Sequence, residues 1–158
     1  MIAIDSSKKL LLNTLKYHPF IIKPSLAELS DYFDVSIDNN DDIQKYMLKL
    51  QELGARNILC SLAENGAILL SEEKQFYYHD TPKKQVLNSL GSGDSMLAGF
   101  IYEYTRSKDY LKALKMAIAC GSSTAFSNTL ASKRNIRFIK DIIKSFFRSF
   151  LTIIYFID

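Results

Sequence analysis

The chain has 158 residues, of which 47% are hydrophobic and 23% are charged. This composition supports one globular core, and the presence of only six glycines and three prolines excludes the disordered and collagen-like classes. Lys and Arg number 20 against 17 for Asp and Glu, without a long basic run, so nucleic-acid binding is not expected. We therefore expect one soluble domain covering residues 1–158.

The cysteines and the first residues bear on the cellular compartment. Cys60 and Cys120 lie far apart in apolar surroundings, which argues against both a disulfide framework and a zinc site. The chain reaches Asp5 too soon for the apolar stretch of a secretory signal. Both features favour the reducing cytoplasm.

The first part of the chain shows strand patterns alternating with helix patterns. Residues 1–4 are typical of the end of a strand, and residues 6–15 predict a helix with three core-facing leucines: Leu10, Leu11 and Leu15. Residues 19–22 predict a short buried strand, after which Ser25 can cap a helix with Glu28 in a capping box.

A longer helix is predicted from Asn39 to a C-terminal Gly54, with one apolar stripe formed by Ile43, Tyr46, Met47, Leu50 and Leu53. Residues 56–62, 67–70 and 75–79 then predict three strands joined by short turns. Strands linked in this way form an antiparallel run. Together with the earlier strands they predict an α/β layered domain with a mixed sheet.

Three helical patterns complete the chain, over residues 94–104, 110–127 and 136–150. The last has basic residues on one face, Lys140, Lys144 and Arg148, and a wide apolar stripe formed by Phe138, Ile139, Ile142, Ile143, Phe146, Phe147 and Phe150. We expect this stripe to cover the core or an interface. A membrane-surface helix is the alternative, because the uncharged run over residues 149–157 is too short to span a bilayer.

Residues 88–100, at a junction leading into a helix, carry the clearest chemical signal. Gly91 and Gly93 let the backbone turn so that amide groups point outward, and the helix N-terminus adds roughly half a positive charge. An anion such as phosphate would bind there, with Asp94 beside it as a candidate base. The alternative is an ordinary turn in which Asp94 is a favourable helix charge. Neither a Walker A loop nor a dinucleotide-binding fingerprint is present.

Residues 88–100 resemble the C-terminal signature of the PfkB carbohydrate kinases, in the ribokinase-like superfamily. Their sequence is Asn-Ser-Leu-Gly-Ser-Gly-Asp-Ser-Met-Leu-Ala-Gly-Phe. Residues 119–127 resemble the next helix of bacterial 1-phosphofructokinases, whose close relatives are tagatose-6-phosphate kinases. The resemblance implies a three-layer ribokinase-like fold with a mixed, mostly parallel sheet. It also implies ATP-dependent phosphorylation of a sugar phosphate, foremost fructose 1-phosphate to fructose 1,6-bisphosphate. Asp94 would be the catalytic base, and the anion hole would be formed by Gly91, Ser92 and Gly93.

Two further segments fit the family with departures. Residues 22–29 resemble its Lys-Pro-Asn-x-x-Glu-Leu stretch, which implies that Glu28 organises Mg²⁺ and phosphate through water, although Ser25 replaces the usual Asn. Residues 60–67 resemble a Ser-Leu-Gly-x-x-Gly-Ala loop that approaches ATP, which implies nucleotide contacts from Ser61, Ala63, Glu64 and Gly66. Ala63 replaces a glycine, and we expect it to be tolerated only with a negative φ. A capping box and a plain hairpin are the alternative interpretations of these two segments.

The resemblance covers residues 1–135 and matches the C-terminal half of the family's sequence. The other half would carry most sugar-binding residues and a β-sheet lid that contributes to dimers. Two hypotheses follow: the ATP-binding and catalytic-base half of a 1-phosphofructokinase, or a non-catalytic nucleotide-binding or partner-binding module. The expected partners are ATP, a sugar phosphate, and either a second copy or the N-terminal half, with neither nucleic acid nor a membrane span.

Overall fold

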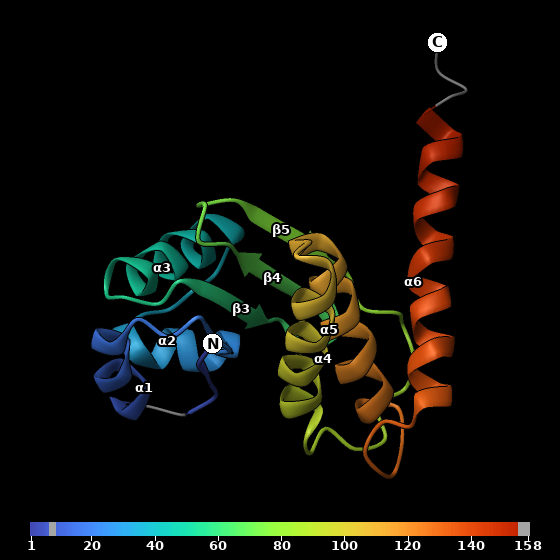
Figure 1. Cartoon of the computed structure of the whole chain (residues 1–158), viewed down its shortest axis with the longest axis horizontal. Coiled ribbons are helices and arrows are strands. Elements are labelled where there is room, and N and C mark those ends of the chain that lie inside the picture. The colour runs from blue at the N-terminus through green and yellow to red at the C-terminus, as the bar shows by residue number, and fades with distance from the viewer. Residues whose placement is uncertain (7–8, 155–158) are drawn as a thin grey trace. The chain divides into compact units, whose positions relative to one another are not determined.

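The computed structural model describes the backbone of residues 1–6 and 9–154 and the side chains of residues 1–6 and 10–143. The chain divides into two compact units, Met1–Asp80 and Thr81–Asp158. Figure 1 shows strands with helices in the first unit, which runs from blue to green, and helices in the second, which runs from yellow to red.

The first unit contains a five-stranded mixed sheet with the strands in chain order, β1-β2-β3-β4-β5. Parallel pairing joins β1 (Ala3–Ile4), β2 (Ile21–Ile22) and β3 (Asn57–Ser61). Antiparallel pairing then joins β3 to β4 (Ala67–Leu70) and β4 to β5 (Phe76–His79). The predicted mixed sheet and its antiparallel run are confirmed, but the described sheet is not mostly parallel, because two of its strand pairs are parallel and two are antiparallel.

Three helices of the first unit pack on the sheet: α1 (Lys9–Thr14), α2 (Leu26–Phe33) and α3 (Asn40–Glu52). α1 continues into the 3-10 helix η1 (Leu15–Tyr17). The buried cluster that joins helices to sheet includes Leu11, Leu15, Leu29, Met47, Leu50, Ile22, Ile58 and Leu70. This burial of apolar area is the main stabilising term of the unit.

Two of the predicted core positions are wrong, because Leu10 is 69% exposed and Leu53 is 52% exposed. Leu10 and Leu11 are consecutive in α1 and so point about 100° apart around the helix axis, and the face that buries Leu11 leaves Leu10 in solvent. Leu53 follows the last residue of α3 as its C-cap, where the helical stripe no longer applies.

Two of the three helix starts predicted in this unit are confirmed, those after Ser25 and Asn39, whereas α1 begins at Lys9 rather than at Ser6. The Ser25 side chain accepts a hydrogen bond from the Glu28 amide, and the Glu28 carboxylate accepts one from the Ser25 amide, which completes the capping box. The Asn39 side chain accepts from the Asp42 amide at 2.9 Å. Each cap satisfies amides that the first helical turn leaves without partners.

The second unit is built from α4 (Ser92–Ser107), α5 (Tyr110–Ala125) and α6 (Lys133–Ile154). Glycines let α4 and α5 approach closely. A Cβ atom on Gly99 would lie 2.8 Å from Cys120 Sγ, and one on Gly121 would lie 3.2 Å from Met96 Cβ. This close crossing fixes the start of α4 against the last turns of α5.

The apolar stripe predicted for the last helix is confirmed only in part. Ile139 and Ile143 are buried, whereas Phe138 is 60% exposed. Lys140 forms an ion pair with Glu103 of α4, with 3.4 Å between Nζ and Oε2. The other predicted aromatic and basic positions, Lys144, Phe146, Phe147, Arg148 and Phe150, and the uncharged run over residues 149–157 lie outside the described side chains. Within the described chain, no helix is both long and apolar enough to cross a membrane.

Candidate functional site

The start of α4 forms a turn with outward-facing backbone groups, which we call the cradle (residues 91–94). Gly91 is the N-cap and has a left-handed backbone, with φ 74° and ψ 3°. A Cβ atom at this position would lie 2.9 Å from Leu130 Cδ2, so a side chain would be both strained and crowded. Its carbonyl accepts from the Ser95 amide at 3.0 Å, which closes the first turn. The predicted role of Gly91 in the turn is confirmed.

Gly93 differs from its predicted role in the turn. α4 begins at Ser92, two residues before the predicted start, so Gly93 is a helical residue and makes no turn itself. The amides of Gly93 and Asp94 belong to the first helical turn, where no earlier helical carbonyl is available to accept them. The Asp94 side chain is exposed beside these amides. The cradle therefore combines anion-attracting amides with a carboxylate that can accept a proton.

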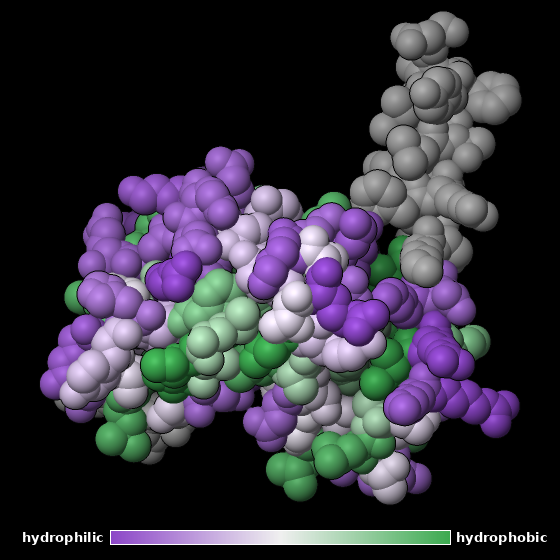
Figure 2. All heavy atoms as spheres, viewed as in Figure 1, coloured by the Kyte–Doolittle hydropathy of each residue, from purple (hydrophilic) through white to green (hydrophobic). Residues whose placement is uncertain are grey.

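The loop that precedes the cradle is held by the end of α5. The carbonyl of Ala125 accepts from the amides of Leu87, at 2.8 Å, and Asn88, at 3.2 Å. The Asn88 side chain in turn accepts from the Leu90 amide at 3.0 Å. Figure 2 shows apolar side chains gathered at the end of the second unit that carries the loops before α4 and after α5. Leu90, which directly precedes Gly91, and Leu130, whose Cδ2 would lie 2.9 Å from a Cβ atom on Gly91, are exposed beside the cradle, and Leu87 is exposed in the same loop.

In the first unit, Glu28 lies at the start of α2, close to the ends of the parallel strands. Its Oε2 accepts from the amide and the hydroxyl of Ser25, at 2.8 and 2.9 Å. Among the described residues there is no group of three or more His, Cys, Asp or Glu side chains that could hold a metal. Mg²⁺ in kinases keeps several waters and binds through few carboxylates and the phosphates of the substrate. A half-buried carboxylate with one oxygen in a capping box fits such a water-mediated role.

The loop from Ser61 to Gly66 begins beside this helix start. The Ser61 amide donates to the Pro24 carbonyl at 3.0 Å, and Ser61 forms a parallel bridge with Ser25. The structure thus brings together the segments of two predicted site residues, Ser61 and Glu28. The loop continues as the 3-10 helix η2 (Ala63–Asn65), with the Ala63 and Glu64 side chains exposed.

The expectation that Ala63 has a negative φ is wrong, because its φ is 52°. Two hydrogen bonds between residues close in sequence close the loop. The Leu62 amide donates to the Gly66 carbonyl at 2.9 Å, and the Gly66 amide donates to the Ala63 carbonyl at 3.2 Å. These bonds impose a left-handed residue at position 63 whichever side chain it carries. An alanine there costs about 1–2 kcal/mol relative to its preferred backbone conformations.

Ala63→Gly is therefore expected to raise the free energy of unfolding by about 0.5–1 kcal/mol, because relief of the left-handed alanine outweighs the larger unfolded-state entropy of glycine. Urea unfolding followed by circular dichroism measures this change. Ala55 is buried and does not have a left-handed backbone, so Ala55→Gly should instead destabilise the chain. An unchanged or lower midpoint for Ala63→Gly would contradict the left-handed assignment.

A polar cluster at the ends of the parallel strands was not predicted from the sequence. Asp5 directly follows β1 and Lys23 directly follows β2, and the two side chains form an ion pair at 3.1 Å. Lys23 is only 7% exposed. Burial raises the pKa of the neighbouring Cys60 thiol to about 12, although Lys23 acts in the opposite direction. Cys60 is thus a protonated thiol at neutral pH and is not a nucleophile.

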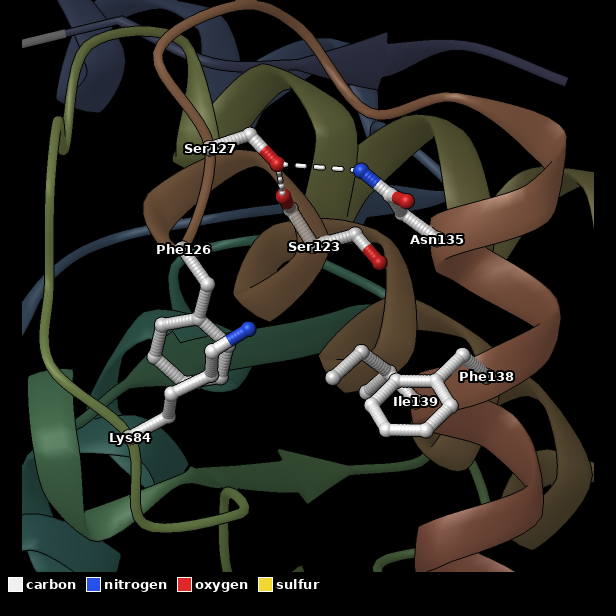
Figure 3. Close-up of a pocket in the computed structure, with 7 residues that line it drawn as sticks. All are labelled: Lys84, Ser123, Phe126, Ser127, Asn135, Phe138 and Ile139. Atoms are coloured by element: carbon white, nitrogen blue, oxygen red, sulfur yellow. Dashed lines mark hydrogen bonds between the residues drawn. The ribbon is translucent and has the colours of Figure 1, made fainter.

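A separate pocket of about 70 Å³ lies between the end of α5 and α6 (Figure 3), lined by Lys84, Ser123, Phe126, Ser127, Asn135, Phe138 and Ile139. Ser127 donates to the Ser123 carbonyl at 2.7 Å, and Asn135 donates to Ser127 Oγ at 3.1 Å. The Lys84 ammonium lies 5.8 Å from the centre of the Phe126 ring. Pockets that enclose a ligand of drug or nucleotide size measure about 300–1,000 Å³, so this one is too small for a nucleotide.

Three segments resemble PfkB kinases in sequence: the cradle, the segment of Glu28 and the segment of Ser61. Comparison with known proteins tests this resemblance. The family model for pfkB family carbohydrate kinases matches residues 2–133. The chain belongs to this family. The resemblance to PfkB kinases, expected over residues 1–135, is thus confirmed over residues 2–133.

Individual relatives agree with this assignment. A 1-phosphofructokinase from Borreliella burgdorferi is 31% identical over 134 residues, which make up 85% of this chain and 44% of the relative. A D-tagatose-1-phosphate kinase from Bacillus licheniformis is 34% identical over 128 residues, or 80% of this chain and 42% of the relative. The chain therefore spans less than half the length of these PfkB relatives.

The fold is confirmed by a solved structure. A crystal structure of a provisionally assigned phosphofructokinase from Staphylococcus aureus, 34% identical, superposes with a TM-score of 0.83. The match covers 88% of this chain and 45% of that chain. The α/β ribokinase-like fold predicted from the PfkB resemblance is thus correct.

Proposed function

We propose that this PfkB chain carries the nucleotide-phosphate and catalytic-base portion of an ATP-dependent kinase that phosphorylates a sugar phosphate. The observation that carries the proposal is the cradle itself. Gly91 turns the chain into a helix N-terminus that presents the Gly93 and Asp94 amides beside an exposed carboxylate, within the segment matched by the family. A helix N-terminus binds phosphate through its amides and its partial positive charge.

In the proposed reaction, the Gly93 and Asp94 amides bind the transferring phosphoryl group, and the Asp94 carboxylate accepts the proton of the acceptor hydroxyl. Gly91 shapes this turn, whereas the Ser92 amide, predicted to share in the anion hole, already donates to the Ser89 carbonyl at 3.1 Å. The bond from the γ-phosphorus to the bridging oxygen breaks, and a bond from the γ-phosphorus to the hydroxyl oxygen forms. ADP leaves with the bridging oxygen, and the hydroxyl proton passes to the Asp94 carboxylate. Positioning and charge stabilisation contribute most of the rate enhancement in such transfers.

We propose that Glu28 helps hold Mg²⁺ through water and that Ser61, Ala63, Glu64 and Gly66 contact the nucleotide. The metal would neutralise charge on the phosphates of ATP. The support for Glu28 is its half-buried carboxylate at the ends of the parallel strands. The support for the loop is the bridge between Ser61 and Ser25 beside that carboxylate, together with the exposed side chains of Ala63 and Glu64. Ligands of open α/β sheets bind beyond the carboxyl ends of the strands.

The proposed acceptor is fructose 1-phosphate, yielding fructose 1,6-bisphosphate. The support is the name of the Borreliella burgdorferi relative. Tagatose 1-phosphate is the second candidate, since the Bacillus licheniformis relative is named for that substrate, whereas the sequence had suggested the 6-phosphate. A cytoplasmic location and either a second copy or an N-terminal half as partner remain predictions.

Calorimetric titration with Mg-ATP and Mg-ADP tests the proposed site. Gly93→Asp places a carboxylate in the cradle and is expected to weaken binding at least tenfold, which corresponds to about 1.4 kcal/mol, through repulsion of the phosphates. The variant should still fold, because an acidic residue in the first turn stabilises a helix.

Gly93→Ala is the matched control, because its backbone is helical and it adds no charge. Its affinity for Mg-ATP should remain near that of the wild type. Equal binding by Gly93→Asp and Gly93→Ala would place the phosphates elsewhere. Absence of saturable binding by the wild-type chain would favour the partner-binding alternative and overturn the proposed kinase role.

A further inference from the structure

We infer that Thr124, in the last turn of α5, is a positioning residue for the cradle at the start of α4. This inference rests on the proposed function, because it concerns the same phosphate site. Thr124 is 1% exposed, so its side chain does not reach a substrate directly. Its effect would be exerted through the two chain segments to which it is hydrogen-bonded.

The Thr124 hydroxyl has partners on both of these segments. Its Oγ1 lies 2.8 Å from Ser95 Oγ in the first turn of α4. It also accepts from the Ala131 amide at 3.0 Å, in the segment that follows α5. A hydroxyl has one donor and two acceptor lone pairs, so both bonds can exist at once.

Both partners adjoin cradle residues. Ser95 follows Asp94 directly, and its amide donates to the Gly91 carbonyl at 3.0 Å. Ala131 follows Leu130, whose Cδ2 would lie 2.9 Å from a Cβ atom on Gly91. One buried hydroxyl thus joins the helical side of the cradle to the segment that covers its glycine.

Loss of this hydroxyl would leave Ser95 Oγ and the Ala131 amide without a protein partner. In Thr124→Val a methyl group fills the place of the hydroxyl at a position that is 1% exposed, so water could bridge the two segments there only if they move apart. Phosphate binding depends on amides held within about 2.7–3.1 Å of the anion, so a small displacement of the first turn would weaken it. A buried hydroxyl with two bonds to one site therefore has a positional role.

The neighbouring Ser123 provides a matched control in the same turn. It is also 1% exposed, but its Oγ has no hydrogen-bond partner within the described part of the chain. In Figure 3 this oxygen points toward the space between α5 and α6, which is lined by Asn135 and Phe138. Ser123→Ala removes a buried hydroxyl that holds no cradle segment.

The experiment measures Mg-ATP affinity by calorimetry for the whole chain and four variants, with circular dichroism as the check of folding. Thr124→Val keeps the side-chain shape and removes the hydroxyl, and it is expected to weaken binding about tenfold or more. Thr124→Ser restores the hydroxyl and should recover most of the affinity. Ser123→Ala should bind as the wild type does, which separates positioning from a general loss of buried polarity.

Ser95→Ala removes only the partner on α4 and should weaken binding less than Thr124→Val. If Thr124→Val does not fold, Ser95→Ala decides the question, and wild-type affinity in that variant would overturn the inference. Wild-type affinity in a folded Thr124→Val chain, or failure of Thr124→Ser to recover binding, would overturn it as well. Absence of binding by the wild-type chain would instead overturn the proposed function and, with it, this inference.

Discussion

On the proposed function, Asp94→Asn is expected to lower the rate of phosphoryl transfer to fructose 1-phosphate by about 10²–10⁴-fold. A positioned general base contributes a rate factor of this size. Asparagine has nearly the same shape as aspartate, but its amide cannot accept the hydroxyl proton. The affinity for Mg-ATP should stay the same or rise, because a carboxylate is removed from beside the phosphates. Because Asp94 is exposed at the first turn of α4, the substitution leaves the packing of the helix intact.

The measurement is a coupled assay of ADP release with the sugar phosphate present, together with a separate calorimetric Kd for Mg-ATP. The expected pattern is a large fall in kcat with a Kd for Mg-ATP that stays constant or decreases. A fall in kcat accompanied by weaker Mg-ATP binding would mean that Asp94 acts in nucleotide binding rather than as a base. An unchanged kcat would exclude the catalytic role.

Asp109→Asn is the matched control for the helix-charge alternative. Asp109 also lies at a helix N-terminus, where it caps α5 by accepting from the Lys112 amide at 2.9 Å. Asparagine caps a helix about as well as aspartate, but this variant loses the charge at the helix N-terminus and its ion pair with Lys112 at 3.1 Å. It should therefore lower the free energy of unfolding by about 0.3–1 kcal/mol and keep turnover. If Asp94 were only a favourable helix charge, Asp94→Asn would lower the free energy of unfolding by about 0.3–1 kcal/mol and leave turnover unchanged.

Much of this chain could be predicted from local patterns, because its most informative signals lie close together in sequence. The capping box needs only Ser25 and Glu28, three residues apart, and the start of α3 needs only Asn39 and Asp42. The antiparallel run from β3 to β5 follows from short strands separated by short turns. The cradle could be located because its glycine and carboxylate stand together before a helix.

Other features depend on contacts that local patterns do not contain. The left-handed φ of Ala63 follows from the hydrogen bonds that close the loop, whereas the residue type suggested the opposite. The Asp5–Lys23 pair follows from the adjacency of β1 and β2, which brings together residues 18 positions apart. The role of Thr124 could not be predicted from the sequence, because its bond to Ser95 depends on how α4 crosses α5.

Gly66→Ala is expected to lower the free energy of unfolding by about 3 kcal/mol. Gly66 has φ 88° and ψ −133°, a region that residues with side chains rarely adopt. A Cβ atom would lie 2.1 Å from the His79 carbonyl oxygen and 2.8 Å from Asp80 Cα. Both are backbone atoms and cannot rotate away, so the loop would have to separate from the end of β5.

Urea unfolding measures this loss, with Gly93→Ala as the control glycine substitution. Gly93 is helical, so alanine there should be neutral or stabilising by up to about 1 kcal/mol. Equal midpoints for the two variants would contradict the close approach of the loop to β5.

Mg-ATP affinity of the folded Gly66→Ala protein, measured at low temperature, then separates the two interpretations of this loop. If the loop binds the nucleotide, its displacement weakens binding beyond the loss caused by partial unfolding. If it is a plain hairpin, the folded fraction binds with wild-type affinity, because β4 and β5 are then only structural neighbours. Stability and affinity therefore fall together only when the backbone around Gly66 is part of the nucleotide site.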